Sequence, residues 1–548
     1  MIPVSPRPGK NAIFEQFRAD DITLMFGNPG TVEQGFLDVL EQTPGMDYVL
    51  ALQETVAVGI ADGYARATAG PALVQLHTGV GLGNAVGMLY QAMRGHSPLV
   101  VIAGDAGVRY DAMDAQMAAD LVGMARPVTK YATRVVHPGS VLRVLRRAVK
   151  TAMTPPRGPV FVALPMDVLD AETAEPAVRT GIPSRAVVPV APDLDRAAEV
   201  LRAAEHPLVL MGDGVAVSGA QPELAELAER LGAQVWGVDS SDLNMDTTHP
   251  LYGGQLGHMF GANSAAVVCC DADAVLIVGT YLFPEVFPLL DSPFRPDAKL
   301  IHIDLDDYEV AKNFPVDIAL IADPKPTLAA LNDRLADLVA PRGGPPPRMS
   351  GAGPGATLRG PEPAPDAALM EVFAAELARR APDGLVTFDE ALTESPALAK
   401  YLPARRTGDY FATRGGSLGI GIPGAIGAKL ARPDREVIGF TGDGGSMYTV
   451  QALWTAARYG VAARFVICNN GRYHLLDDNI EHYWRDRGIP AHEYPRGFDL
   501  TTPEIDFTGL ARSLGVEAVR VDKPTQVESA VRRLLTEPGP FLIDLVVT

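Results

Sequence analysis

Two short polar segments, each following an apolar run, carry the residue types that bind a divalent metal ion. The first is Thr441-Gly442-Asp443-Gly444-Gly445, after EVIGF, and the second is Asn469-Asn470, after RFVIC. If the two apolar runs are neighbouring parallel strands, Asp443 and Asn470 emerge side by side at their carboxyl ends. Carboxylate and amide oxygens suit Mg²⁺ or Ca²⁺, with a backbone carbonyl near Arg472, water and phosphate oxygens as the remaining ligands.

The glycines around Asp443 favour a diphosphate as the ligand of this site. Without Cβ atoms they let the backbone approach phosphate groups, and a helix from about Ser446 to Gly460 would present its positive end to them. Each segment alone also has a structural explanation, because Gly-Asp-Gly can be a simple turn and Asn-Asn a strand end. A second Gly-Asp-Gly, at residues 212–214, follows a strand but has no Asn-Asn at a matching distance.

The elements that would position these residues recur along the whole chain. Short apolar runs such as PALVQLH, PLVVIAG and DAVLIVG alternate with alanine-rich helical stretches. This alternation is typical of parallel sheets that are covered by helices on both faces. Proline- and glycine-rich segments at 172–193 and 340–366 divide the chain. The sequence therefore predicts three doubly wound parallel-sheet α/β domains, at about residues 1–180, 190–340 and 365–548.

The composition excludes several classes of partner. Lysine and arginine number 47 against 66 aspartate and glutamate residues, a net charge of −19, so we expect no nucleic acid and no anionic membrane as partners. The three cysteines lack metal-type spacing. The most apolar stretch is interrupted by Asp271 and Asp273, and the first residues lack a signal core, so we expect a soluble cytoplasmic protein.

The combination of Gly-Asp-Gly and Asn-Asn resembles the signature of thiamine diphosphate enzymes, in which Asp443 and Asn470 match the two side-chain metal ligands. The resemblance covers nearly the whole chain. It is strongest to the benzoylformate decarboxylases, followed by the acetolactate synthases. It implies pyrimidine-binding, central and diphosphate-binding domains in that order, with thiamine diphosphate and Mg²⁺ (or Ca²⁺) as cofactors.

In the first domain the resemblance implies three catalytic residues and one cofactor contact. Glu54, which opens a helix after the strand YVLAL, matches the glutamate that binds N1′ of the pyrimidine and favours its imino tautomer; the alternative is an ordinary acid in a first helical turn. Thr31 stands where benzoylformate decarboxylases have a substrate-contacting serine, or else caps a helix before Val32. His77 matches the first catalytic histidine of the family, or is a structural histidine, and Asn84 follows it in a glycine-rich turn.

In the third domain Leu418 matches the large apolar residue that bends the cofactor, and Thr393 is the expected hydroxyl beside the diphosphate. The segment 419–424 also fits a Gly-x-Gly-x-x-Gly dinucleotide fingerprint, but Pro423 lies inside it and no clear strand precedes it. The implied cofactor-binding residues are Glu54, Asn84, Thr393, Leu418, Gly442, Asp443, Gly444, Gly445, Ser446, Asn470 and Tyr473. The implied metal ligands are Asp443, Asn470 and the backbone of Arg472.

The sequence departs from the benzoylformate decarboxylase pattern at the second active-site histidine. We expect this residue within VGTYLFPEVFPLL (278–290), which contains no histidine and has Thr280, Tyr281 and Glu285 as its polar residues. His474, four residues after Asn470, either takes over the later proton steps as a catalytic residue or is a surface histidine.

The resemblance implies decarboxylation of a small-molecule 2-keto acid through a C2 ylid and an enamine, which is protonated to an aldehyde or captured by a second carbonyl compound. An acetolactate-synthase-like carboligase is the alternative, and Gln116 resembles a glutamine of those enzymes. FAD in the central domain would accompany that alternative, although no sequence motif supports it. A non-catalytic cofactor-binding homologue and a nicotinamide dehydrogenase are further alternatives. The resemblance implies a homodimer at least, and a homotetramer is expected.

Overall fold

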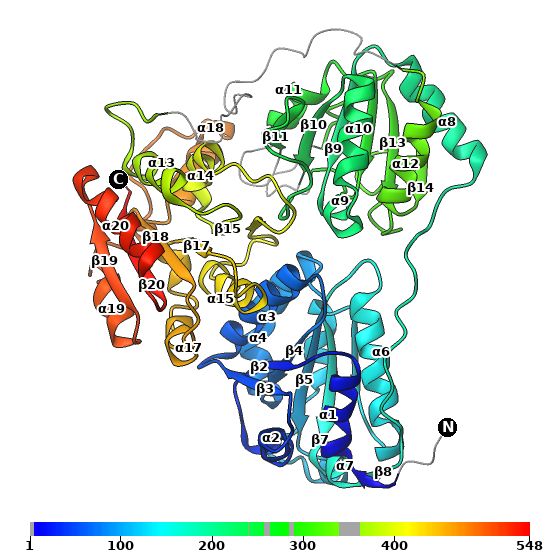
Figure 1. The fold of residues 1–548 in the computed structure, drawn as a ribbon, viewed down its shortest axis with the longest axis vertical. Coiled ribbons are helices and arrows are strands. Elements are labelled where there is room, and N and C mark those ends of the chain that lie inside the picture. Colours follow the sequence, from blue (N-terminus) through cyan, green and yellow to red (C-terminus); the bar gives the residue numbers. More distant parts are fainter. Residues whose placement is uncertain (1–4, 239, 257–262, 284–289, 339–361, 548) are drawn as a thin grey trace.

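The chain folds into three α/β domains, each built on a six-stranded parallel sheet (Figure 1). In this computed structural model the described residues are 5–238, 240–256, 263–283, 290–338 and 362–547. The predicted fold class is therefore confirmed. None of the helices in the described ranges is long and apolar enough to cross a lipid bilayer.

The first domain has the strand order β3-β2-β4-β5-β7-β6. Side chains of β5 alternate between two cores, since Val100 and Ile102 pack on one face of the sheet and Val101 and Ala103 on the other. A short antiparallel pair, β1 with β8, joins the two ends of the domain. The elements are β1 Arg7–Pro8, α1 Gly9–Ala19, β2 Leu24–Gly27, α2 Gln34–Glu41, β3 Asp47–Leu50, α3 Glu54–Thr68, β4 Ala72–Leu76, α4 Thr78–Arg94, β5 Leu99–Asp105, α5 Leu121–Ala125, β6 Tyr131–Arg134, α6 Val141–Met153, β7 Val160–Pro165, α7 Met166–Asp170 and β8 Glu172–Thr173.

The central domain repeats this arrangement with the order β11-β10-β9-β12-β13-β14. Along β12, Val275 and Ile277 face one core while Leu276 and Val278 face the other. Its elements are α8 Ala191–Ala203, β9 Pro207–Met211, α9 Asp213–Ser218, α10 Gln221–Leu231, β10 Gln234–Val238, β11 Tyr252–Leu256, α11 Asn263–Cys269, β12 Ala274–Val278, β13 Lys299–Asp304, β14 Ile318–Ile321 and α12 Pro324–Arg334.

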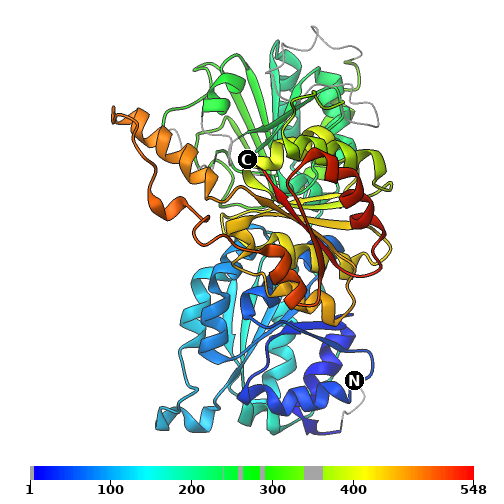
Figure 2. The ribbon, with the colours of Figure 1, turned by 90° about the vertical axis from the view of Figure 1, so that its left-hand side faces the viewer.

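The third domain has the order β16-β15-β17-β18-β20-β19. The neighbours that matter for the site are β17 and β18, which are parallel and aligned so that Gly442 lies opposite Cys468. The elements are α13 Leu369–Arg380, β15 Val386–Glu390, α14 Ser395–Tyr401, β16 Tyr410–Ala412, α15 Gly421–Ala431, β17 Val437–Gly442, α16 Asp443–Ser446, α17 Ala452–Arg458, β18 Arg464–Asn469, α18 His474–Asp486, α19 Phe507–Ser513, β19 Glu517–Val521, α20 Pro524–Thr536 and β20 Phe541–Val546. Figure 2 shows α18 projecting outward from this domain.

The expectation of one helix from about Ser446 to Gly460 is wrong, because the segment forms two short helices, α16 and α17, with turns between them. Ser446 ends the first helix, and its hydroxyl donates to the Asp443 carbonyl at 2.7 Å. Thr449 lies in the turn and donates to the Gly419 carbonyl at 2.6 Å. The turn thus binds the loop that precedes α15.

Helices α3 and α15 join the first and third domains, and they cross at glycines (Figure 1). A Cβ atom on Gly63 would lie 2.1 Å from the Gly424 carbonyl oxygen, and one on Gly427 would lie 1.9 Å from the Ile60 carbonyl oxygen. No side chain fits at these positions without moving backbone, so the two helices are in direct backbone contact. The apolar residues around the crossing form one hydrophobic core that both domains share.

Candidate active site

Asp443 and Asn470 lie side by side at the carboxyl edge of the third sheet. Asp443 directly follows β17, Asn470 directly follows β18, and the two strands are paired. The Gly471 backbone N–H donates to Asp443 Oδ2 at 2.7 Å, and the Arg472 N–H donates to Asn470 Oδ1 at 3.0 Å. The predicted convergence of a carboxylate and an amide at this edge is therefore present.

The oxygen chemistry of this edge fits a hard divalent cation. Asp443 is buried, and burial raises the pKa of its carboxyl group, although backbone N–H groups of Gly444 and Gly471 act in the opposite direction. A cation would offset that desolvation and hold the carboxylate ionised. The described residues contain no group of three or more His, Cys, Asp or Glu side chains that could hold a metal. A cation at Asp443 and Asn470 would therefore need further oxygens, which a diphosphate can supply.

The backbone around Asp443 also fits a diphosphate. A Cβ on Gly442 would meet nothing within 4 Å, so there is open space over the turn. The ring of Tyr473 packs against Gly444, where a Cβ would lie 2.3 Å from Tyr473 Cε1. Gly445 lies against Thr441 and Glu390. The turn is thus open at Gly442 and closely packed at Gly444 and Gly445.

Glu390, at the end of β15, anchors the loop that carries Leu418. It is fully buried, and its carboxyl oxygens accept hydrogen bonds from the backbone N–H groups of Gly419 at 2.5 Å and Gly421 at 2.7 Å and from the Thr441 hydroxyl at 3.0 Å. Burial raises the pKa of Glu390 to about 7. The half-buried Leu418 directly precedes Gly419, so the hydrogen bond from Gly419 to Glu390 also restrains the position of Leu418.

Thr393 lies in a single 3₁₀ turn, residues 392–394, directly after β15. The preceding Leu392 has a φ of 53°, a left-handed conformation that is strained for a residue with a Cβ atom. Such strain is concentrated at functional sites. Because β15 pairs with β17, Thr393 lies on the same edge of the sheet as Asp443, one strand away.

Glu54 is held by two amide side chains. It is the first residue of α3 and is 5% exposed. Asn28 Nδ2 donates to its Oε1 at 3.2 Å, and Asn84 Nδ2 donates to its Oε2 at 2.9 Å. Gly81 lies so close to Oε1 that a Cβ there would be 3.1 Å away. Asn84, predicted as a cofactor contact, thus holds the glutamate together with Asn28, a residue that no sequence motif indicated.

His77 is paired with a buried glutamate that the sequence analysis also missed. Its Nδ1 lies 2.8 Å from Glu33 Oε2, while Glu33 Oε1 accepts from the Gly104 N–H at 2.8 Å. Burial raises the pKa of Glu33, although His77 acts in the opposite direction. The imidazole packs on Gly30, where a Cβ would lie 1.9 Å from Nδ1, and the following Thr78 has a strained φ of 39°.

Thr31 is exposed at the start of a 3₁₀ turn over residues 31–33, two positions before Glu33. Gly30 occupies the cap position of this turn, and no side-chain cap bond is formed there, so the alternative of Thr31 as a helix cap is wrong. Thr31 therefore belongs to the same loop as Asn28 and Glu33, the partners of Glu54 and His77.

His474 lies at the start of α18, with about half of its side chain exposed and its Nδ1 3.6 Å from Asp477 Oδ2. Arg472, whose backbone was predicted to bind metal, directs its side chain to the same Asp477 at 2.6 Å. Tyr281, in the segment where the second histidine was expected, is hydrogen-bonded to Arg94 and lies under the Lys312 ammonium group. Glu285 lies outside the described residues.

The second Gly-Asp-Gly has a structural role. Asp213 accepts hydrogen bonds from the Ser241 N–H at 2.9 Å and Asn244 at 3.0 Å, and it forms a buried ion pair with Arg414 at 3.0 Å. The carboxylate thus ties the central domain to the third domain, and its oxygens are already occupied.

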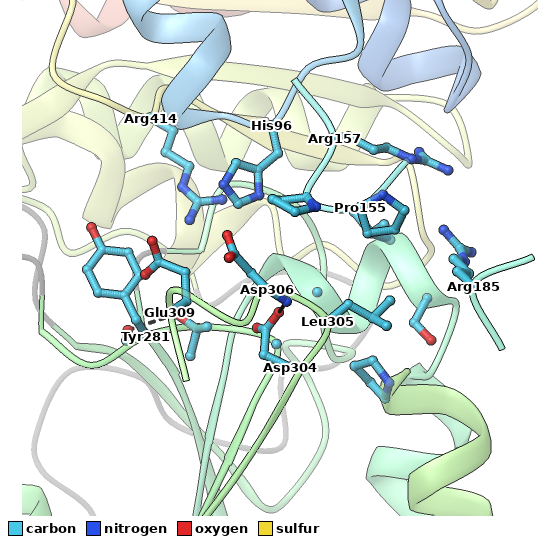
Figure 3. Close-up of a pocket in the computed structure, with 17 residues that line it drawn as sticks. His96, Pro155, Arg157, Arg185, Tyr281, Asp304, Leu305, Asp306, Glu309 and Arg414 are labelled. Carbon is cyan, nitrogen blue, oxygen red and sulfur yellow. Dashed lines mark hydrogen bonds between the residues drawn. The ribbon is translucent and has the colours of Figure 1, made fainter. Parts of the chain in front are cut away.

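A cavity of about 60 Å³ lies between the first and central domains, at the carboxyl ends of β9, β12 and β13 (Figure 3). Arg157 and Arg185 approach it from one side and Asp304, Asp306 and Glu309 from another (Figure 3). Burial lowers the pKa of Arg157 to about 10 and raises that of Asp304 to about 7. A cavity of this size has room for a few water molecules.

The candidate residues thus form two groups in one chain. The first-domain group contains Thr31, Glu54, His77 and Asn84, and the third-domain group contains Thr393, Leu418, Gly442, Asp443, Gly444, Gly445, Ser446, Asn470, Arg472, Tyr473 and His474. Within the described ranges no hydrogen bond or ion pair joins the two groups.

Comparison with known proteins agrees with this arrangement. The family model described as the thiamine pyrophosphate enzyme N-terminal TPP binding domain matches residues 7–124, the central domain model matches 194–331, and the C-terminal TPP binding domain model matches 393–545. A benzoylformate decarboxylase of Pseudomonas aeruginosa is 32% identical over 98% of both chains. An acetolactate synthase large subunit of Lactococcus lactis is 26% identical over 99% of this chain and 93% of its own.

A solved structure is also similar over its full length. The thiamine diphosphate-dependent 4-hydroxybenzoylformate decarboxylase of Rhodococcus jostii RHA1 superposes with a TM-score of 0.87 at 29% identity, over 99% of both chains. With all three domain models matched in order and a relative above 30% identity along nearly the entire chain, this protein belongs to the thiamine pyrophosphate enzyme family.

Proposed function

We propose that this chain is a Mg²⁺-dependent lyase that uses thiamine diphosphate to decarboxylate a 2-keto acid. The observation that carries the proposal is the pair of prepared sites, a buried Glu54 with both oxygens held and an Asp443–Asn470 pair beside an open glycine turn. When bound, thiamine diphosphate supplies a carbanion that adds to the keto carbon and takes up the electron pair left by CO₂.

The residues of the chain then have defined tasks. Asp443, Asn470 and the backbone at Arg472 would hold the metal, and the glycine turn with Ser446, Thr393 and Tyr473 would surround the diphosphate. Glu54 would hold a proton at N1′ of the pyrimidine, and Leu418 would keep the cofactor bent. His77, held by Glu33, would move a proton at the substrate carbonyl oxygen, while the Thr31 hydroxyl would contact the substrate carboxylate. His474 would serve the later proton steps.

The two groups of residues also support a proposal about assembly. Because no contact in the described part of one chain joins Glu54 to Asp443, we propose that the first domain of one subunit completes the site on the third domain of another. Exposed apolar side chains on α4, Val80 and Tyr90, and after α16, Met447 and Tyr448, are available for such an interface. A homodimer is the minimum, a homotetramer is proposed, and the cytoplasm is the proposed compartment.

Product analysis tests this function. Purified protein with thiamine diphosphate and Mg²⁺ is incubated with a panel of 2-keto acids that includes benzoylformate and pyruvate, and CO₂ and organic products are measured. Release of CO₂ with the matching aldehyde supports the proposal. Acetolactate from pyruvate alone would instead identify a carboligase. Tight cofactor binding without CO₂ release from any 2-keto acid would identify a non-catalytic homologue and contradict the proposal.

A further inference from the structure

A chain of hydrogen-bonded polar groups, buried at Gln75 and Glu54 and partly exposed at Tyr48 and Asn28, leads from strand β3 to Glu54. The Tyr48 hydroxyl donates to Gln75 Oε1 at 2.5 Å, and Gln75 Nε2 donates to the Asn28 backbone carbonyl at 3.1 Å. The Asn28 side chain then donates to Glu54 Oε1 at 3.2 Å. Gln75 is fully buried, so both ends of its amide need partners, and both have one.

The direction of each hydrogen bond in this chain is fixed. The Asn28 backbone carbonyl can only accept, so the nitrogen of the Gln75 amide must face it and the oxygen must face Tyr48. Tyr48 must therefore donate. Burial, with Glu33 and Glu54 nearby, raises the pKa of the Tyr48 phenol, which keeps it neutral and able to donate.

The backbone of β2 is shaped to accommodate this chain. A Cβ on Gly27 would lie 2.6 Å from Gln75 Oε1 and 2.7 Å from the Tyr48 hydroxyl oxygen. Only glycine leaves room for the two polar side chains to meet above the strand. Gly27 directly precedes Asn28, so the position of Asn28 is set by its own carbonyl bond and by the packing of its neighbour.

The carboxylate of Glu54 receives one N–H donor on each oxygen, from Asn28 and Asn84. Two donors on opposite sides fix the rotation of the carboxyl group. We propose that Asn28 is a positioning residue for Glu54, and that Gln75 and Tyr48 hold Asn28 in place for this task. The proposal deepens the proposed function, because it rests on Glu54 as the residue that binds the cofactor pyrimidine.

Strand β4, which carries Gln75, also helps to set the position of His77, which follows the strand. Side chains two residues apart on a strand point to the same face, so Gln75 and His77 both face the loop 28–33. Gln75 holds the start of this loop at Asn28, and His77 contacts it at Gly30 and Glu33. The loop 28–33 thus contacts Glu54 through Asn28 and His77 through Gly30 and Glu33.

The test measures turnover and cofactor binding after the contact to Glu54 is removed. Asn28→Ala removes the donor, and Asn28→Asp replaces it with a second carboxyl of nearly the same size, which opposes Glu54. A hydrogen bond to a charged group contributes about 1.5 kcal/mol or more, so both kcat and the affinity for thiamine diphosphate should fall by roughly tenfold in Asn28→Ala and further in Asn28→Asp. Tyr48→Phe should lower both quantities by a smaller amount, because it loosens Gln75. Tyr64→Phe is the matched control, since Tyr64 lies on α3 and packs against Phe26 away from this chain.

Three readouts are used for every variant: kcat and KM for a 2-keto acid, the affinity of the apoprotein for thiamine diphosphate by tryptophan fluorescence, and the thermal unfolding midpoint. A fall in kcat and in cofactor affinity in both Asn28 variants, with the unfolding midpoint and Tyr64→Phe unchanged, supports the proposal. Wild-type kcat and cofactor affinity in Asn28→Ala and Asn28→Asp, or an equal loss in Tyr64→Phe, would overturn it. If the wild type turns over no 2-keto acid, the proposed function fails, while the cofactor affinities still decide the role of Asn28.

Discussion

The imidazole Nδ1 of His77 lies 2.8 Å from the Oε2 of Glu33, a side chain with no exposed surface. The carboxylate also accepts from the Gly104 N–H, so its position is fixed from both sides. A carboxylate at Nδ1 orients the ring and leaves Nε2 as the nitrogen that exchanges protons.

Replacing Glu33 with glutamine should change the tautomer of the His77 ring while the ring itself stays in place. The amide oxygen would keep the Gly104 bond, so the NH₂ group would face Nδ1 and force the proton onto Nε2. We expect kcat to fall by roughly 10²-fold or more, with cofactor affinity unchanged. Steady-state kinetics and a cofactor titration measure both quantities. Wild-type kcat in Glu33→Gln would show that the ring orientation does not matter.

Glu54→Gln should bind thiamine diphosphate but lose most activity. Glutamine retains the volume of the side chain but cannot share a proton with N1′, and its NH₂ group would oppose one of the two asparagine donors. A fall in kcat of roughly 10²-fold or more is expected. Cofactor affinity by fluorescence titration is the control, because the Asp443 edge is untouched. Undiminished turnover would contradict the role of Glu54.

Asp443→Ala should abolish the metal-dependent retention of the cofactor. The change removes the one carboxylate at the site and leaves Asn470 as the remaining side-chain oxygen donor of the pair. A Mg²⁺ titration followed by tryptophan fluorescence, with and without EDTA, measures the loss. Asp333→Ala, an exposed acid on α12, is the control for general charge removal. Unchanged Mg²⁺ affinity in Asp443→Ala would refute the ligand assignment.

His302 should make the central domain sensitive to acid. Its Nε2 bonds to the Thr280 carbonyl at 2.8 Å and its Nδ1 accepts from the Ala311 N–H at 3.1 Å, which fits a neutral ring, and burial lowers its pKa to about 4. The unfolded chain takes up the proton near pH 6.5, so stability present above that value is lost as the pH falls towards 4. From pH 7 to 5 this amounts to about 2 kcal/mol.

The measurement is hydrogen exchange of peptides from β12 and β13 at pH 7 and pH 5, corrected for the intrinsic exchange rate. His302→Asn should lower protection at pH 7 but remove most of the additional loss at pH 5. His137→Asn, at an exposed histidine of the first domain, is the control and should behave as wild type. If His302→Asn and wild type lose equal protection between pH 7 and pH 5, His302 is not the cause of the acid sensitivity.

The sequence allowed prediction of those features that depend on local patterns. Apolar runs of strand length separated by helical stretches predicted three parallel sheets, and the position of Asp443 and Asn470 after two such runs predicted their meeting. These features follow because the carboxyl ends of neighbouring parallel strands must lie together.

Features that depend on long-range packing could not be predicted. Glu33 and His77 are 44 residues apart, and nothing in the loop that holds Glu33 distinguishes it from a surface acid. Glu390 ends β15 and accepts a hydrogen bond from Gly419 in the loop of Leu418, and no pattern in the sequence links these two segments. The helix expected after Asp443 is interrupted by a turn in which Thr449 bonds to Gly419, a partner 30 residues away. In each case the deciding contact is a hydrogen bond between segments whose proximity only the tertiary fold creates.

The glycine contact between α3 and α15 has a consequence for how substrate can enter. Glu54 begins α3, and Leu418 lies three residues before α15, so these two residues are carried by helices in direct backbone contact at Gly63, Gly424 and Gly427. Such a junction cannot hinge without breaking its shared apolar core. The first and third domains of a subunit therefore move as one rigid body. Any opening that admits substrate to the site must come from the loops and not from a hinge between these domains.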